Sequence, residues 1–503
     1  MPRECAVVFD CGSTNVTVVA VSPEGQILAS ASRHNDPDPQ PDAHEGWLIW
    51  DMDRLWRDVC DASREALSKL TDAAPVAVTV TTWGADGAPV RPDGSLTYPP
   101  IAWACPRLEP VAAEFSRTHD PWETYAETGY VVIPFNTIFK LIWLRENVPQ
   151  ALEEAACWMM MPGLLSYRLC QEFSIDPTAA GTTMAVDAGR RAWSPRMLAL
   201  ADLTPDFFPR WCEPGTVIGQ VTAAAAEQTG LPTGIPVVAA GHDTQFAAVG
   251  ACAHEGEAIL SSGTWEILML RDRRYNPTRL GFEEGVIIEL DAEAGLWNPQ
   301  FLMMASGVIE WLRDLAFSDL AGRPDAYETM IREAEKVPPG SEGVTVIPSF
   351  VPSTGPTKKY GTQGTVLGLE LATTRGHLYR AVLEGLSFQL RQAVSLLSEA
   401  TGAEIRAVRV VGGGSKNPLW NQIRADVLGM PVVTIAQKEA TVLGAALFAL
   451  VGAGVHESIG AAQDAVRAGE TVVEPGPNQE RYAELFERYA VLPEALARFY
   501  KQA

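Results

Sequence analysis

The first residues able to do chemistry follow an apolar run near the amino terminus: Asp10, Gly12, Ser13, Thr14 and Asn15. A glycine lets the backbone turn sharply and approach a ligand. The backbone N–H groups beside it and the two hydroxyls are donors that suit phosphate oxygens. The carboxylate of Asp10 suits Mg²⁺, which is usually held partly through water. The alternative interpretation is an ordinary hairpin turn, in which the same residue types are favoured.

A loop of the same character recurs roughly half a chain later. Gly263 and Thr264 follow the apolar run 257–261 and precede the apolar run 265–270. Paired with the first loop, this one predicts an internal duplication and two phosphate-binding loops, one from each of two similar domains. Two unrelated hairpins are the alternative.

Three consecutive glycines, Gly412 to Gly414, separate a predicted strand over 408–411 from a predicted helix over 417–428. Glycines allow a flat or bulky ligand to come close to the backbone. The helix amino terminus, with Asn417 as its N-cap, adds positive dipole character. The spacing matches neither the P-loop nor the dinucleotide-binding glycine pattern. A flexible connection is the alternative.

A carboxylate beyond the apolar run 235–240 is a candidate general base. Asp243 follows Gly241 and His242 and could accept the proton of an attacking hydroxyl. Alternatively, Asp243 caps a helix predicted over 244–250, a role that does not exclude catalysis. His242 taken alone is more typical of a structural hydrogen bond.

Four further residues suit the binding of a polyol. The carboxylate of Asp86 could accept two hydroxyl hydrogens, and Trp83 could stack on the apolar face of a sugar. Trp103 and Arg107 could complete such a pocket. The alternatives are a turn aspartate, two core tryptophans and a surface arginine.

These residues need particular elements to position them, and the sequence predicts a β-meander at the amino terminus. Apolar runs rich in β-branched residues, separated by polar turns, occupy 5–10, 16–21 and 26–31. Another strand is predicted over 76–81, just before Trp83. The region 340–375 is expected to be dominated by loops, and amphipathic helices are expected to end the chain.

The overall composition excludes several classes of protein. Lys and Arg number 39 against 62 Asp and Glu, a formal net charge of −23 that argues against binding nucleic acid or anionic lipid. The eight cysteines form no Cys-x-x-Cys pair, which is typical of reduced thiols. The longest uncharged apolar stretch, 441–455, is too short to span a bilayer and predicts a buried helix. We therefore expect a cytoplasmic protein with no nucleic-acid or membrane partner.

In their order and spacing, these motifs resemble the FGGY family of carbohydrate kinases. The likeness covers nearly the whole chain, through the segments 10–15, 83–87, 241–243, 262–264, 412–417 and 440–446. The resemblance implies an α/β fold with two ribonuclease-H-like domains, of the actin/hexokinase type, that flank a deep catalytic cleft. We expect the first domain to span 1–248 and the second 249–503.

The resemblance also implies residue roles, with Asp243 as the general base and with Asp10 and Asp243 as the ligands of Mg²⁺. The sugar would contact Trp83, Asp86, Trp103, Arg107 and Asp243. ATP would be bound by Asp10, Gly12, Ser13, Thr14, Asn15, Gly263, Thr264, Gly307, Gly412, Gly413, Gly414 and Asn417.

The activity implied is transfer of the γ-phosphoryl group of ATP to the terminal hydroxyl of a ketose. Within the family, the resemblance implies L-fuculose as the sugar, which would give L-fuculose 1-phosphate. Alternatives in the same class are L-rhamnulose, D-ribulose, D-xylulose and a signalling diketone. A more remote alternative is an actin-like switch ATPase, which would hydrolyse ATP without a sugar and would have no need of a polyol pocket. A homodimer is compatible with the resemblance.

Overall fold

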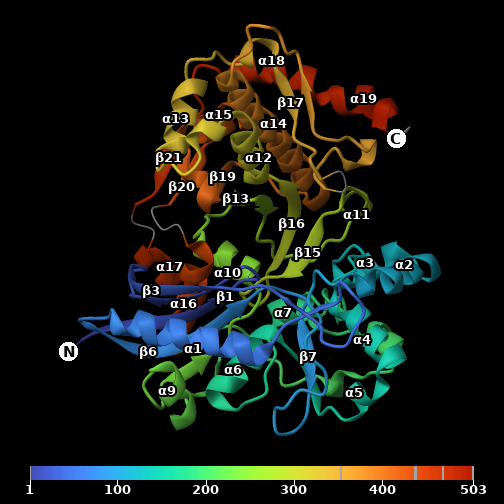
Figure 1. The fold of residues 1–503 in the computed structure, drawn as a ribbon, viewed down its shortest axis with the longest axis vertical. Coiled ribbons are helices and arrows are strands. Elements are labelled where there is room, and N and C mark those ends of the chain that lie inside the picture. The colour runs from blue at the N-terminus through green and yellow to red at the C-terminus, as the bar shows by residue number, and fades with distance from the viewer. Residues whose placement is uncertain (1, 352–353, 436–438, 467–468, 501–503) are drawn as a thin grey trace.

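The computed structural model describes residues 2–351, 354–435, 439–466 and 469–500. They form two lobes, one above the other in Figure 1, and each lobe is built around one large sheet. The first lobe contains the amino-terminal strands. The second lobe contains the long helix α14 (Arg375–Thr401), which lies in the upper half of the figure.

The sheet of the first lobe has six strands, and the predicted meander forms its β1–β2–β3 side. In spatial order they are β11 (Val217–Gln220), β12 (Pro236–Val238), β6 (Ala73–Thr82), β1 (Arg3–Cys11), β2 (Asn15–Val21) and β3 (Ile27–His34). β1 pairs antiparallel with β2 and parallel with β6, so Asp10 at the end of β1 lies between Thr17 and Thr81.

The sheet of the second lobe has seven strands. In spatial order they are β15 (Ile287–Leu290), β16 (Trp297–Met304), β14 (Trp265–Met269), β13 (Glu257–Ser262), β19 (Ala407–Val411), β20 (Val432–Thr434) and β21 (Thr471–Val473). β13, β14 and β16 form an antiparallel meander, while β19 runs parallel to β13 and β20 runs parallel to β19.

The two sheets share one topology, which confirms the predicted internal duplication. In each sheet a three-stranded antiparallel meander is followed by two strands that run parallel to its first strand. The turn after β1 and the turn after β13 therefore occupy equivalent places in the two lobes.

The remaining elements cover these sheets or extend the first lobe. The shorter strands pair in twos: β4 (Asp38–Pro39) with β5 (Leu48–Ile49), β7 (Gly87–Val90) with β8 (Cys157–Met160), β9 (Val186–Asp187) with β10 (Ala192–Trp193), and β17 (Thr345–Ile347) with β18 (Thr365–Leu367). The other helices in the first half are α1 (Met52–Ser68), α2 (Glu109–Thr118), α3 (Pro121–Thr128), α4 (Thr137–Asn147), α5 (Pro149–Glu153), α6 (Met161–Cys170), α7 (Pro177–Gly181), α8 (Pro195–Leu198) and α9 (Ala223–Thr229). Those in the second half are α11 (Arg279–Glu284), α12 (Ser306–Ala316), α13 (Ala326–Ala334), α15 (Pro418–Leu428), α18 (Gln479–Ala490) and α19 (Leu492–Tyr500).

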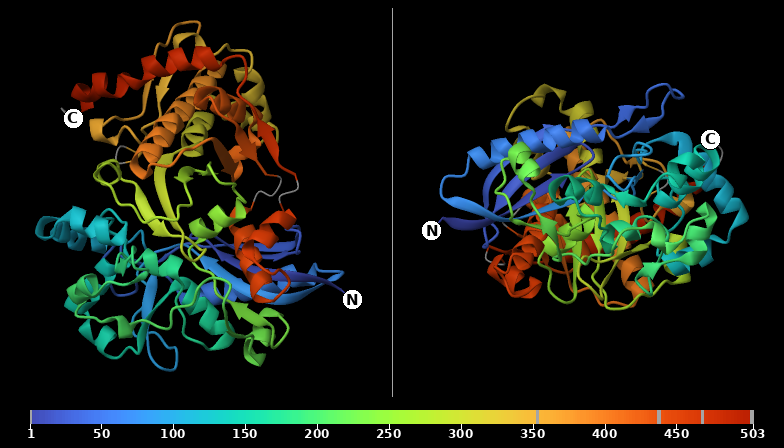
Figure 2. Two further views of the ribbon diagram at one scale, coloured as in Figure 1. Left: turned by 180° about the vertical axis from the view of Figure 1, so that it is seen from behind. Right: turned by 90° about the horizontal axis from the view of Figure 1, so that it is seen from below.

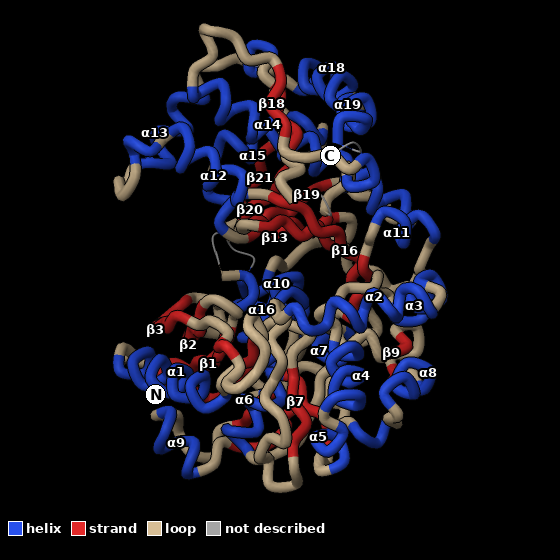
Figure 3. Tube along the Cα trace, turned by 45° about the vertical axis from the view of Figure 1, so that its right-hand side comes forward, coloured by secondary structure: helices blue, strands red, loops and turns tan. Residues whose placement is uncertain are grey.

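Two helices lie between the lobes, α10 (Asp243–Gly250) and α16 (Ala440–Gly452) (Figure 3). α16 contacts β1 and β6, and α17 (Ile459–Val466) lies beside it, so the chain returns to the first lobe before β21, α18 and α19 complete the second (Figure 2). Sequence reasoning correctly predicted that α16 is buried. α16 lies within the predicted second domain, 249–503, and its contacts with β1 and β6 place it beside the first-lobe sheet.

The part of the chain that the structure describes holds no helix with both the length and the apolarity needed to cross a bilayer. α16 is the most apolar of these helices. It is almost wholly buried, as expected for an apolar helix inside a protein. Its apolar side chains share a core with Val8, Val238 and Phe246.

α10 and α16 cross in direct backbone contact because each carries a glycine at the crossing. A Cβ atom at Gly250 would lie 1.9 Å from the carbonyl oxygen of Ala440, and one at Gly444 would lie 1.9 Å from that of Phe246. No side chain fits at either position unless the helices move apart.

We predict that Gly444→Ala lowers the free energy of unfolding by roughly 1–3 kcal/mol, the usual cost of overpacking a core. Urea denaturation followed by circular dichroism measures this change. The matched control is Gly460→Ala in α17, where the nearest atom to an added Cβ is Ser458 Oγ at 3.9 Å. The control is expected to unfold at or slightly above the wild-type urea concentration. Equal loss in both variants would contradict the proposed role of the crossing.

Candidate active site

A cavity of about 290 Å³ lies between the two lobes, and both contribute to its wall. Its apolar part is formed by Trp83, Trp103 and Phe135 from the first lobe and by Ile267, Ile287 and Leu302 from the second. Its polar part includes Ser13, His242, Thr244, Glu289 and Gln300. A small molecule with both hydroxyls and an apolar face fits this distribution.

Asp243 is the first residue of α10, and His242 rather than Asp243 occupies the N-cap position. The alternative role of Asp243 as the helix cap is therefore wrong. Its Oδ1 atom accepts hydrogen bonds from the Thr244 backbone N–H at 2.6 Å and from the Thr244 hydroxyl at 3.2 Å. Burial raises the pKa of Asp243, while the neighbouring His242 opposes that shift.

Asp10 and Asp243 lie close enough for their charges to interact. Burial, followed by the negative charges of Asp243 and Glu439, raises the pKa of Asp10 to about 7. Two partly buried carboxylates that repel one another form a donor set that a divalent cation would stabilise. These oxygen donors fit the predicted Mg²⁺, whose remaining ligands in such sites are commonly water and substrate phosphates.

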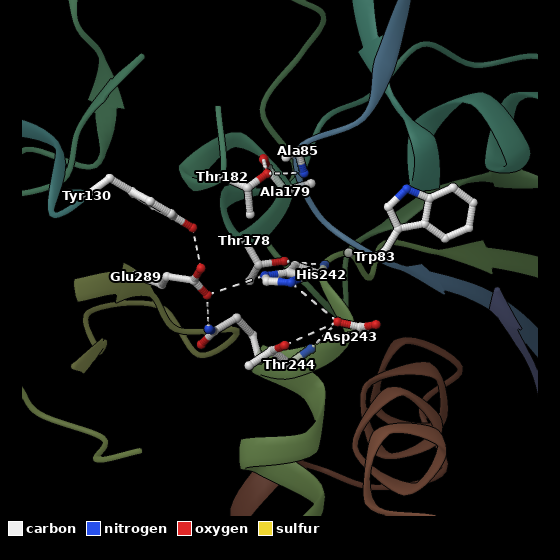
Figure 4. Close-up of polar contacts among 12 residues, drawn as sticks. Trp83, Ala85, Tyr130, Thr178, Ala179, Thr182, His242, Asp243, Thr244 and Glu289 are labelled. Atoms are coloured by element: carbon white, nitrogen blue, oxygen red, sulfur yellow. Dashed lines mark hydrogen bonds and ion pairs between the residues drawn. The ribbon is translucent and has the colours of Figure 1, made fainter. Parts of the chain in front are cut away.

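Glu289 in β15 reaches the cavity from the second lobe and meets three side chains there (Figure 4). It accepts hydrogen bonds from the Tyr130 hydroxyl and the Gln245 amide, and its Oε2 lies 3.3 Å from His242 Nδ1. The other ring nitrogen of His242, Nε2, lies 3.3 Å from Asp243 Oδ1. A line of contacts therefore runs from Tyr130 through Glu289 and His242 to Asp243.

The electrostatics along this line of contacts favour a protonated His242 and an ionised Glu289. Burial opposes protonation of His242, but Glu289 and then Asp243 outweigh it and raise the pKa of His242 to about 9. Burial alone would raise the pKa of Glu289, but His242 and the hydrogen bonds lower it. Sequence reasoning missed Glu289, Tyr130 and Gln245. The available signal was a carboxylate inside the otherwise apolar strand β15.

Each of the two phosphate-type loops is closed by a backbone hydrogen bond from its glycine to a residue further along the loop. The Gly12 N–H donates to the Asn15 carbonyl at 2.8 Å, and the Gly263 N–H donates to the Trp265 carbonyl at 2.9 Å. In the first loop Ser13 lines the cavity, while Thr14 and Asn15 are exposed. Each loop thus leaves polar groups free for a ligand.

The second loop continues into α12. The Gly307 N–H donates to the Thr264 carbonyl at 3.2 Å, and a Cβ at Gly307 would lie 3.2 Å from the Thr264 side chain. The structure thus brings the predicted nucleotide residues Thr264 and Gly307 together.

The glycine loop after β19 rests on the same part of the second lobe. A Cβ at Gly412 would lie 2.7 Å from the Ser262 carbonyl oxygen, and one at Gly414 would lie 2.0 Å from the Ser262 hydroxyl. At Gly413, by contrast, a Cβ would meet no atom within 4 Å. Asn417 is the N-cap of α15, as predicted, but its side-chain amide donates to the Tyr379 hydroxyl at 3.0 Å. Open space for a ligand is therefore found at Gly413.

Asp86 requires a correction, because it does not face the cavity. Its carboxylate is fully buried and ion-paired with the equally buried Lys140. One oxygen, Oδ2, also accepts hydrogen bonds from the Trp50 indole at 2.6 Å, the Trp83 indole at 2.8 Å and the Trp103 backbone N–H at 3.1 Å. These donors occupy the carboxylate that was predicted to bind sugar hydroxyls. Asp86 instead holds two tryptophans of the wall, Trp83 and Trp103, in place.

Arg107 is also turned away from the cavity. Its guanidinium lies 4.2 Å from the ring centre of Trp47 and 5.1 Å from that of Trp143, and it donates to Gln40 at 2.6 Å and to Tyr98 at 3.1 Å. Arg107 therefore does not line this cavity, and its contact with the sugar stays a prediction. Trp83 and Trp103 do line the cavity, where 44% of Trp103 is exposed.

Comparison with known proteins places this site in a wider group. Two models describe the FGGY family of carbohydrate kinases: the model of its N-terminal domain matches residues 5–250, and the model of its C-terminal domain matches residues 258–453. An L-fuculokinase from Escherichia coli (strain K12) is 41% identical over 458 residues, which cover 91% of this chain and 94% of that protein. An L-fuculokinase from Salmonella typhi is 40% identical over 459 residues, with the same coverage.

Among solved structures, xylulose kinase from Rhodospirillum rubrum superposes with a TM-score of 0.84 at 26% identity, covering 99% of this chain and 100% of that one. The predicted α/β fold with two sheet-containing domains is confirmed by this likeness.

We predict that Asp86→Asn lowers the free energy of unfolding by about 3–5 kcal/mol, because it leaves the Lys140 ammonium buried without its counter-charge. Urea denaturation measures the loss. Adding Lys140→Met to this variant should restore part of the stability, since the unpaired charge is then gone while the amide oxygen still accepts from the indoles. If Asp86→Asn were as stable as the wild type, the ion pair would have no structural role.

Proposed function

This chain belongs to the FGGY family of carbohydrate kinases, and we propose that the sugar it phosphorylates is L-fuculose. It is a phosphotransferase with an alcohol group as acceptor, and ATP is the phosphate donor of the family. The proposed product is L-fuculose 1-phosphate.

One observation carries this proposal: Asp243 lies between His242 and Thr244, which both line the small-molecule cavity, and its charge interacts with that of Asp10, just before the phosphate-type loop of the first lobe. Thr244 beside it and Ser13 of that loop both line the cavity. A hydroxyl bound in the cavity would therefore lie between a carboxylate and groups that suit phosphate oxygens. This is the arrangement that phosphoryl transfer to an alcohol needs.

In the proposed reaction, Asp243 accepts the proton of the sugar hydroxyl while the oxygen of that hydroxyl bonds to the γ-phosphorus. The bond between the γ-phosphorus and the β,γ-bridging oxygen breaks at the same time, and ADP leaves. Ser13 and Thr14 from the first lobe and Thr264 from the second would donate hydrogen bonds to the β- and γ-phosphates. Mg²⁺, when bound at Asp10 and Asp243, would neutralise phosphate charge. The open backbone at Gly413 supports a nucleotide position beside the second lobe.

L-fuculose is supported by the two L-fuculokinases that resemble this chain over most of its length. The cavity also suits a 6-deoxy ketose, because an apolar wall that includes Ile267 and Leu302 faces the polar side with His242 and Thr244. Moving a methyl group from water to such a wall lowers the free energy of the complex. A terminal hydroxyl placed there would lose its hydrogen bonds to water without gaining new ones.

The proposal is tested by coupled ADP release with Mg²⁺–ATP against L-fuculose, L-rhamnulose, D-ribulose, D-xylulose, L-ribulose and glycerol. We expect kcat/KM to be highest for L-fuculose. A higher value for another ketose would replace the substrate while keeping the enzyme class. ATP hydrolysis that no sugar stimulates would instead favour the switch-ATPase alternative.

We predict that Asp243→Asn lowers kcat by about 10² or more, the usual scale for loss of a general base. Steady-state kinetics with the preferred sugar measure this, and calorimetry of sugar binding shows whether the pocket survives. Asp61→Asn, an exposed position on α1, is the control and should keep wild-type turnover. Wild-type kcat in Asp243→Asn would remove Asp243 from the role of base.

A further inference from the structure

We infer that Glu289 is a positioning residue for the phosphoryl transfer: from the second lobe it holds the His242 ring, and through that ring it holds the carboxylate of Asp243. The inference rests on the proposed role of Asp243 as the base. It assigns a function to a residue that belongs to none of the motifs recognised in the sequence.

The first step of the argument is the line of contacts shown in Figure 4. Glu289 Oε2 lies 3.3 Å from His242 Nδ1, and His242 Nε2 lies 3.3 Å from Asp243 Oδ1. Both ring nitrogens lie at ion-pair distance from carboxylates, so turning the ring would separate at least one of these charge pairs. Its orientation is therefore set from the Glu289 side.

The second step concerns which oxygen of Asp243 is held. His242 and both donors of Thr244 all contact Oδ1. Within residues 2–351, 354–435, 439–466 and 469–500, no donor is hydrogen-bonded to Oδ2. Anchoring one oxygen fixes the plane of the carboxylate and leaves the other oxygen available for the proton of an acceptor hydroxyl.

The third step is that Glu289 is itself held firmly. Only 4% of the residue is exposed, its Oε1 accepts from the Tyr130 hydroxyl, and its Oε2 accepts from the Gln245 amide. To turn towards a sugar hydroxyl, the Glu289 carboxylate would have to break one of these two hydrogen bonds. This favours a role in positioning over direct sugar binding.

The fourth step is the position of Glu289 on the opposite lobe from Tyr130. The N–H of Ile288, the residue before it in β15, donates to the Gly129 carbonyl at 2.8 Å, and a Cβ at Gly129 would lie 2.1 Å from the Ile288 carbonyl oxygen. This close backbone contact seats β15 against the first lobe. Alignment of Asp243 thus depends on the two lobes being in contact at this point.

The test is Glu289→Gln, which keeps the size of the side chain and removes its charge. We expect kcat to fall about 10- to 100-fold, the scale of a misplaced catalytic group, while KM and the calorimetric Kd for the sugar change less than about threefold. Unchanged kcat would overturn the inference. A raised sugar Kd with kcat retained would also overturn it, because Glu289 would then be a sugar ligand.

Three further variants complete the test. Glu284→Gln is the matched control: Glu284 is another buried glutamate of the second lobe, paired with Lys359 at 2.7 Å, and its loss should leave kcat unchanged. In a double-mutant cycle, Glu289→Gln should cause little additional loss when His242→Gln is already present. Fully additive losses would show that Glu289 does not act through His242. Glu289→Asp, which keeps the charge but shortens the side chain, serves the same cycle if the amide variant fails to fold.

A spectroscopic readout separates this inference from the proposed activity. In protein labelled with ¹⁵N-histidine, the His242 ring resonances are assigned by their loss in His242→Gln. We expect Glu289→Gln to shift the Nδ1 resonance, whichever sugar is the substrate, and unchanged resonances would overturn the contact. Absence of sugar-dependent turnover in the wild type would instead overturn the proposed function, whatever the resonances show.

Discussion

The crossing of α10 and α16 is the contact on which the rest of the site depends. Its two glycines, Gly250 and Gly444, bring the helix backbones together with no room for a side chain. α10 begins with Asp243, and α16 packs against β1, which ends near Asp10. The separation of the two carboxylates is therefore set by how closely the helices approach. A rigid backbone contact is better suited to this than a contact between flexible side chains.

Buried ion pairs stabilise the loops on both sides of the junction. In the first lobe Asp86 and Lys140 lie behind the tryptophan wall, and in the second lobe Glu266 and Arg424 lie behind the loop that follows Ser262. Removing such charges from water is costly, and the hydrogen bonds around each pair must offset that cost. A pair that is well satisfied only in one geometry favours that geometry over others. The first pair contributes to holding Trp83 and Trp103 at the cavity wall, and the second contributes to holding Ser262 before its loop.

Features that depend on neighbouring residues could be predicted from the sequence. The β-branched runs predicted β1 and β2, and Asn417 before Pro418 predicted the start of α15. Asp86 was assigned to the sugar because its carboxylate could accept two hydroxyl hydrogens close to Trp83, which could stack on a sugar. The partners that occupy it, Trp50 and Lys140, come from segments far away in the chain. No local pattern distinguishes a carboxylate that awaits a ligand from one already satisfied by the fold.

Glu289 was missed for the same reason, because its partners Tyr130, Gln245 and His242 are far from it in the chain. Its position also shows how the site is shared between the two lobes. Most of the polar groups around the cavity belong to the first lobe and α10, while Glu289, Ile267 and Leu302 come from the second. Neither lobe alone could both surround a sugar and exclude water from it. Excluding water matters because ATP can transfer its phosphoryl group to water as well as to a sugar. A base whose alignment requires both lobes would be fully aligned only when the cavity wall is complete, which would favour the sugar over water.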